Sequence, residues 1–226
     1  MKNEMTGAEG AEWEQEVALV ATAVKWRNAG FEVAEATKWW GADFTPAETT
    51  KWRALDISLE DARAWRAVGF TPEAAHLWHR KKFNAVAAAE WRAAGFDIAE
   101  AAEWRGAGFN AANATEWRDE EFYPDEAAEW RDEGFMPIIA AWWRDKDFIP
   151  TPAGEWKDEG FGPSKQYDIR YQAVAVKWRD AGFYPDDAHE WCKRDFSSGA
   201  AAGWRDMGFT PTTAAARRRN VPYEYD

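Results

Sequence analysis

Tryptophan recurs every thirteen residues along most of the chain. Fifteen of the seventeen tryptophans belong to this series, and only the step from Trp156 to Trp178 departs from it, by nine extra residues. From Trp26 onward, the fifth residue after the tryptophan is phenylalanine in thirteen of fourteen units, with Ile57 as the exception. Self-similarity at a fixed period predicts a repeat architecture, in which each unit needs its neighbours to cover its apolar side.

The repeating unit has the pattern WRxxGFxPxxAxE, which is typical of a short helix with its own start and stop signals. Thr71 stands where an N-cap is needed, and Pro72 follows at the first helical position. Gly95 stands at the C′ position, which places Trp91 and Phe96 at the two positions that touch in a Schellman motif. We therefore expect helices of about ten residues joined by connections of about three.

Six joints lack the glycine that a left-handed C′ residue favours. A residue with a side chain costs more free energy in that conformation, so we expect these joints to be strained. The C′ residues concerned are Asp43, Asp56, Lys82, Glu121, Asp147 and Asp195.

Taken together, the pattern predicts an all-α, elongated solenoid of tandem 13-residue single-helix repeats with a Trp/Phe/Ala core. The nine-residue insertion contains no glycine or proline after Pro163, so we expect one long helix from Pro163 to about Ala181. The expected organisation is an N-terminal capping helix of about double length at 1–29, repeats at 30–161, the inserted helix at 162–181, further repeats at 182–216 and a polar C-terminal tail at 217–226.

Reactive constellations are scarce in this sequence. Cys192 is the single cysteine, which excludes an intrachain disulfide framework and favours a cytoplasmic protein. His76 and His79 lie three residues apart on one predicted helix, but no third metal ligand accompanies them. No apolar segment is long enough to span a bilayer. We expect no enzyme activity, no cofactor, no metal site and no membrane partner.

Arginine or lysine follows the repeat tryptophan in eleven of fourteen units. One interpretation is a cationic groove that binds a polyanion such as nucleic acid. The other is structural, because a cation suits the last turn of a helix and acids such as Glu90 precede the tryptophan, available to neighbouring helices. The net charge of −12 disfavours nucleic acid, so we expect the structural role.

A second group of residues breaks the rules of the repeat. Three consecutive cap positions hold apolar or aromatic residues, and nearby positions that are usually polar are also apolar. Because the three cap residues are thirteen apart, we expect them to line up along the array. They lie in the segment 116–159, which has fourteen acids and five bases. The candidate partner-binding residues are Tyr123, Met136, Ile138, Ile139, Trp142 and Ile149.

These observations favour a non-enzymatic scaffold for protein–protein interaction with a basic protein partner. Two alternatives stay open: a structural subunit of a larger macromolecular assembly, and a polyanion binder. The apolar residues of the candidate patch could also pack against the inserted helix instead of a partner. In that case they would belong to the intramolecular core.

Overall fold

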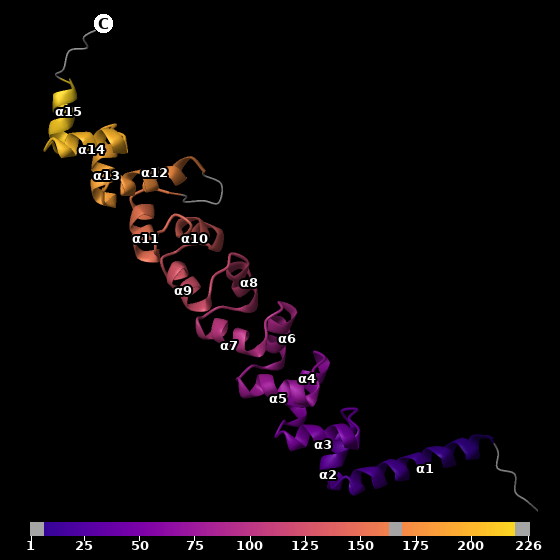
Figure 1. Cartoon of the computed structure of the whole chain (residues 1–226). Helices are drawn as coiled ribbons and strands as arrows, with labels where there is room; N and C mark the ends of the chain where they lie inside the picture. Colours follow the sequence, from indigo (N-terminus) through magenta and orange to yellow (C-terminus); the bar gives the residue numbers. More distant parts are fainter. Residues whose placement is uncertain (1–6, 163–168, 220–226) are drawn as a thin grey trace, which may run out of the picture. The chain divides into compact units, whose positions relative to one another are not determined.

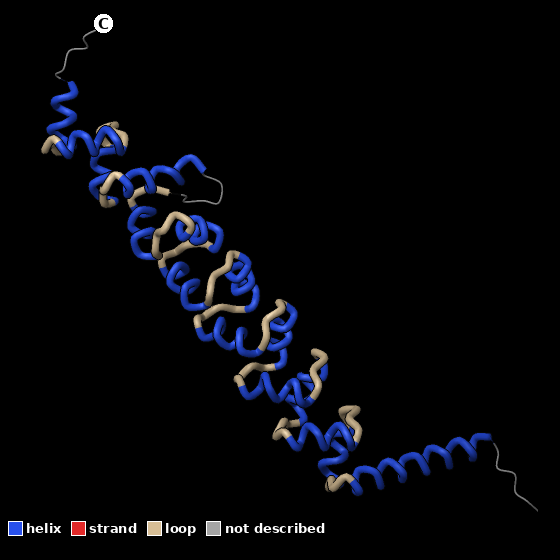
Figure 2. The backbone as a smooth tube through the Cα atoms, in the orientation of Figure 1, coloured by secondary structure: helices blue, strands red, loops and turns tan. Residues whose placement is uncertain are grey.

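The computed structural model describes residues 7–162 and 169–219, and within these residues all regular structure is α-helical. Figures 1 and 2 show one short helix following another, joined by tight loops. The described helices are α1 (Gly7–Asn28), α2 (Val33–Trp40), α3 (Pro46–Ala54), α4 (Leu59–Ala67), α5 (Pro72–Arg80), α6 (Ala85–Ala93), α7 (Ile98–Gly106), α8 (Ala111–Asp119), α9 (Pro124–Asp132), α10 (Pro137–Arg144), α11 (Pro150–Asp158), α12 (Ile169–Asp180), α13 (Pro185–Cys192), α14 (Ser198–Asp206) and α15 (Pro211–Arg219). The predicted fold of tandem helical repeats is confirmed.

The helices begin where the sequence supplies a cap. The Thr71 side chain accepts a hydrogen bond from the Ala74 N–H, with Pro72 at the first helical position. Thr45 and Glu48 form a complete capping box. These hydrogen bonds from Thr45 hold the pKa of Glu48 below its usual value. The start signals in the sequence therefore act as expected.

The helices end in Schellman motifs. At the end of α6, the Phe96 N–H donates to the Trp91 carbonyl at 3.1 Å, and the Gly95 N–H donates to the Arg92 carbonyl at 3.0 Å. The glycines of all eight Gly-Phe joints have φ between 75° and 87°. The six joints without glycine also adopt the left-handed conformation, with φ between 55° and 65°. The left-handed conformation expected at the joints is confirmed, and the strain expected at the six joints without glycine stays a prediction.

The chain divides into two compact units, residues 1–103 and 104–226, and each is described by itself. In the first unit, α4 packs on α5 and on α6, and α3 packs on α5. In the second unit, α8 packs on α10, α9 packs on both α10 and α11, and α13 packs on α12 and α14. Helices therefore contact both the next helix and the next but one, which arranges them in two alternating rows (Figure 1).

Tryptophan and phenylalanine alternate through the core in edge-to-face contact. The two rings of one joint, such as Trp117 and Phe122, lie about 5.0 Å apart between centroids, and Phe122 then meets Trp130 of the next helix at 6.4 Å. The recurrent alanines, such as Ala114, are fully buried. In the second unit the ring contacts run without a break from Trp104 to Phe196.

Two helices are longer than the other described helices, which have eight or nine residues. α1 has 22 residues, as expected for the double-length helix at the start. α12 has twelve, and its residues 169–180 agree with the predicted inserted helix, whereas the predicted start at Pro163 lies outside the described residues. α15 includes 217–219, which we had placed in the polar tail. Among the described residues, no helix is both long and apolar enough to cross a membrane.

Candidate functional site

The cations that follow the repeat tryptophan bind the end of the helix two places earlier. Arg66 of α4 donates from Nη2 to the Ala42 carbonyl at 2.7 Å and from Nη1 to the Asp43 carbonyl at 2.9 Å, at the end of α2. Its guanidinium carbon lies 3.7 Å from the centre of the Phe44 ring. One side chain thus satisfies two carbonyls that the helix leaves free and makes a cation–π contact.

The same contacts recur in both units. We call the arginine and lysine residues that make them the ladder cations. Each stacks on the phenylalanine 22 residues earlier, except Arg179, for which the insertion lengthens the separation to 31. The described examples are Arg53, Arg66, Arg92, Arg131, Arg144, Lys157, Arg179, Arg205 and Arg218. These contacts join each of the described ladder cations to the end of another helix.

The partners of the ladder cations differ from our expectation. We expected carboxylates of neighbouring helices, but main-chain carbonyls and phenylalanine rings are the main contacts. Arg53 with Glu35 at 3.6 Å, and Arg144 with Glu126 at 3.9 Å, are the ion pairs that described ladder cations make with another helix. The reason is geometric, because the cation reaches the end of the next-but-one helix, where the carbonyls are free.

One exception to the ladder affects the ring and the cation together. Ile57 is the one repeat position without phenylalanine, and the residue 22 positions later, where a ladder cation would stand, is the exposed His79. The aromatic ring and the cation are therefore missing together. This pairing is expected if the two side chains stabilise each other.

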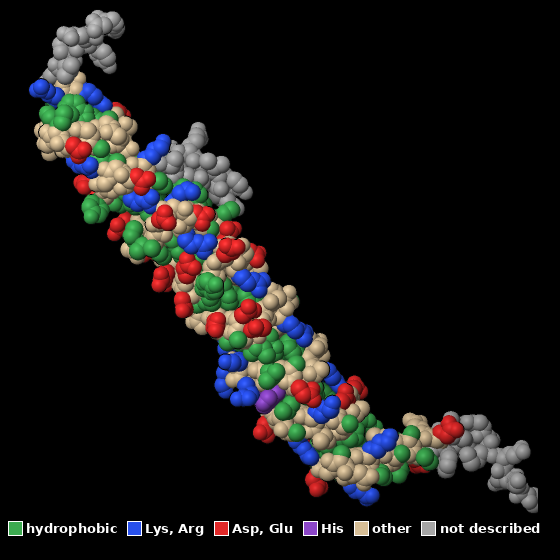
Figure 3. Space-filling model, viewed as in Figure 1, with side chains coloured by type: hydrophobic (Ala, Val, Ile, Leu, Met, Phe, Trp, Pro, Cys, Tyr) green, Lys and Arg blue, Asp and Glu red, His purple; other side chains and the backbone are tan. Residues whose placement is uncertain are grey.

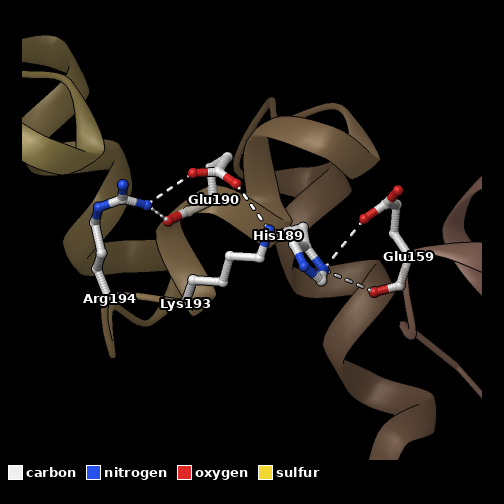
Figure 4. A network of polar contacts seen from close by, with 5 residues as sticks. All are labelled: Glu159, His189, Glu190, Lys193 and Arg194. Carbon is white, nitrogen blue, oxygen red and sulfur yellow. Dashed lines mark hydrogen bonds and ion pairs between the residues drawn. The ribbon is translucent and has the colours of Figure 1, made fainter.

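His189 replaces the ladder cation in α13, where Cys192 occupies the usual position (Figure 4). Its Nδ1 lies 3.1 Å from the Glu159 carbonyl oxygen and 3.2 Å from the Glu159 carboxylate, at the end of α11. Its ring and that of Phe161 lie edge to face, with 6.5 Å between their centroids. His189 thus binds the end of α11, which a ladder cation would otherwise bind.

Cys192 has no activating neighbours. Lys193 and Arg194, which could have stabilised a thiolate, pair instead with Glu190 at 3.0 and 2.8 Å (Figure 4) and hold the pKa of that carboxyl below its usual value. Burial raises the pKa of the Cys192 thiol, against a smaller opposing effect of a hydrogen bond with Trp178. Among residues 7–162 and 169–219, no three histidine, cysteine or acidic side chains gather as a metal site would require.

The candidate partner-binding residues fall into three groups. Tyr123, Met136, Ile138 and Ile149 are exposed, with exposed fractions from 44% to 77%. Trp142 is half-buried and stacks edge-to-face on Trp143 at 5.2 Å. Ile139 is buried, at 7% exposure, so including it in an exposed patch was wrong: it points into the core, next to the fully buried Ala140. As expected, Tyr123, Met136 and Ile149 make no side-chain capping bond.

Three of the four exposed residues, Met136, Ile138 and Ile149, line two grooves. The α9–α11 groove, of about 380 Å³, is lined by Ile149 and by three carboxylates: Glu126 and Glu129 of α9, and Glu133 just after it. The α8–α10 groove, of about 420 Å³, is lined by Met136 and Ile138 and by three carboxylates: Glu116 and Asp119 of α8, and Glu120 just after it. Figure 3 shows acidic and hydrophobic side chains interspersed over this part of the molecule.

The two grooves lie on different helix rows, which corrects our expectation of a single line. Because a helix packs on its next-but-one neighbour, equivalent positions of one row are 26 residues apart and not thirteen. Tyr123 and Ile149 therefore belong to one row, and Met136 to the other. The sequence period did not reveal this, since it does not specify which helices lie side by side.

One carboxylate of the α9–α11 groove is held in place. Glu133 accepts a hydrogen bond from the Thr151 hydroxyl at 3.0 Å. A Cβ atom on Gly154 would come within 2.6 Å of the same carboxylate, which would then have to shift. Arg144, the cation of this groove, already binds the carbonyls of Glu120 and Glu121. The groove thus combines an excess of fixed negative charge with an apolar rim.

Tyr184 was not among the predicted partner-binding residues, but it is 78% exposed and precedes α13 without a capping bond. The available signal was the Tyr-Pro pair of residues 184–185, which repeats that of residues 123–124. Arg218 was not predicted to act as a ladder cation either, because it lies within the terminal arginine triplet, yet it stacks on Phe196.

Comparisons with protein families, with curated proteins and with solved structures found no match to this chain. The fold itself defines the class of protein: an all-α protein of tandem helical repeats with a Trp/Phe core. Members of this structural class stack their units to create extended surfaces, so function has to be argued from the surface of this particular chain.

Proposed function

We propose that this protein is a non-enzymatic scaffold, located in the cytoplasm, that binds a basic segment of a protein partner in the α8–α10 and α9–α11 grooves. The observation that carries the proposal is the exposure of apolar side chains at helix starts, each beside three carboxylates. A partner with apolar residues flanked by lysine or arginine would complement both features.

The loss of capping supports this proposal. A capping side chain stabilises a helix by about 1 kcal/mol, and α9, α10 and α11 all lack one. The replacements Tyr123, Met136 and Ile149 are exposed, so burial in the isolated chain does not offset the loss. Binding of a partner would offset it.

The polyanion alternative has less support. The described ladder cations bind carbonyls and stack on phenylalanine rings, so a polyanion would have to compete with contacts that hold the helices together. The remaining alternative, a structural subunit of a larger assembly, uses the same grooves with a permanent partner.

The test restores the missing caps. In a Met136→Ser, Ile149→Ser variant, serine can cap α10 and α11 but presents no apolar surface. The probe is a peptide that alternates leucine and lysine, and its counterpart with glutamate in place of lysine is the negative control. We expect the variant to melt at a higher temperature than the wild type and to bind the basic peptide at least about tenfold more weakly.

The matched control is Leu77→Ser, which removes an exposed apolar side chain from α5 in the other unit. It should leave affinity for the basic peptide unchanged. Equal affinity of wild type and the double serine variant, or equal binding of the acidic peptide, would refute the proposed groove function. A lower melting temperature of the double variant would show that these side chains stabilise the fold instead.

A further inference from the structure

The start of the array presents an uncovered apolar face. After Trp13 the series would have a Gly-Phe joint, but Val17 and Ala18 occupy those positions and α1 continues without folding back. In the described residues, no helix therefore covers this side of α1 and α2. The exposed residues of this head face are Val20, Val24, Val33 and Trp40, with exposed fractions from 38% to 81%, around a groove of about 690 Å³.

The head face also carries a cation at the sequence position of the ladder cations that makes none of their contacts. Arg27 follows a repeat tryptophan, as the ladder cations do, and lines the groove. It is exposed, and its side chain makes no hydrogen bond or ion pair with the described part of the chain. Two carboxylates of α1, Glu14 and Glu16, are exposed on the same helix.

The α14–α15 end of the array, which we call the tail face, also exposes apolar side chains. Trp204 and Phe209 are half-exposed, whereas the other repeat tryptophans and phenylalanines for which burial is described are buried. The cause lies in α15, which has Arg217 where the series would place tryptophan. Met207, at the end of α14, is 63% exposed. In the described chain, no cation stacks on Phe209.

The register of the ladder relates the two faces. A ladder cation binds carbonyls at the end of the helix two places earlier. A helix placed after α15 would therefore direct its cation to the end of α14. If that helix were α1 of a second copy, Arg27 would reach the free carbonyls at the end of α14 and the ring of Phe209, as Arg66 reaches the end of α2 and Phe44.

Charge favours the same arrangement. Glu14 and Glu16 of α1 are exposed, and so are Arg217 and Arg219 of α15. The α1 helix of one copy and the α15 helix of another therefore offer exposed side chains of opposite charge, which attract each other. We propose that the chain self-associates head to tail, with the α1–α2 face of one copy covering the α14–α15 face of another. This inference does not depend on the proposed groove function.

The experiment uses the full chain in analytical ultracentrifugation. A head variant, Val33→Glu with Trp40→Glu, and a tail variant, Met207→Glu with Arg217→Glu, each change exposed residues of one face only. We expect the average mass of the wild type to rise at least about twofold between micromolar and submillimolar concentrations, as contacts of moderate affinity require. Each variant alone should stay monomeric.

Mixing the two variants gives the decisive result. Each retains one intact face, so an equimolar mixture should form a heterodimer and nothing larger. A wild type that stays monomeric, a tail variant that still dimerises through its head, or a mixture that stays monomeric would overturn the proposal. Circular dichroism checks folding, and if the head variant unfolds, Arg27→Glu serves as the second head variant with the same expected outcomes. The Met136→Ser, Ile149→Ser variant should associate like the wild type, which separates this inference from the groove function.

Discussion

At the scale of single residues, each position of the repeat has a defined conformational or packing task. The C′ residue must adopt positive φ, and the sequence identifies all fourteen such positions because the signal is local: glycine, or a substitute, just before the phenylalanine or, at one joint, before Ile57. Burial of Ile139 was not predictable in the same way. Ile138 and Ile139 are adjacent, and only the orientation of α10 against its neighbours decides which of them faces the core.

The first prediction concerns strain at one joint. Asp147 has φ of 60°, where a side chain is unfavourable, so Asp147→Gly should raise the free energy of unfolding by about 0.5 to 1 kcal/mol. Urea denaturation measures this change. The control is the opposite substitution at another joint, Gly95→Ala. A Cβ atom there would meet nothing within 4 Å, so the expected loss of about 1 kcal/mol in the free energy of unfolding is purely conformational. Destabilisation by Asp147→Gly would argue against strain at this joint.

At the scale of the helices, start and stop positions follow from the sequence, but the ladder contacts do not. Caps and Schellman motifs depend on residues within one or two turns, so the pattern alone identifies them. The contact between a cation and the phenylalanine 22 residues earlier depends on which helices pack together. The joint loss of phenylalanine at Ile57 and of the cation at His79 was a usable signal of this pairing.

The second prediction concerns the aromatic core. A nine-residue helix is marginal by itself, so its stability depends on side chains such as Trp91, which is 3% exposed. Trp91→Ala should lower the free energy of unfolding by about 3 to 5 kcal/mol. The equivalent change at the half-exposed Trp204 should cost clearly less. Equal losses in thermal or urea denaturation would show that burial of the ring is not the source of stability.

At the scale of the whole molecule, the unit of construction is a pair of helices, and within each compact unit a helix packs on its next-but-one neighbour. This explains how the nine-residue insertion is accommodated: Phe161 still meets Trp178 at 6.3 Å, and Arg179 still stacks on Phe148. The sequence predicts the repeat class and four exposed residues of the candidate site. It does not predict two grooves, because a hydrophobic period fixes the buried face of a helix and not its neighbours.

The pairing of next-but-one helices by the ladder is tested most directly by a double-mutant cycle on Phe122 and Arg144. The variants Phe122→Leu and Arg144→Met, singly and combined, are compared with the wild type by urea denaturation. A cation–π contact with a centroid distance of 4.0 Å predicts a coupling free energy of about 1 kcal/mol. The control cycle pairs Arg144→Met with Phe109→Leu, whose ring serves Arg131, and should show coupling near zero. Zero coupling between Phe122 and Arg144, or equal coupling in both cycles, would contradict the claim that contacts between ladder cations and phenylalanine rings stabilise the packing of next-but-one helices.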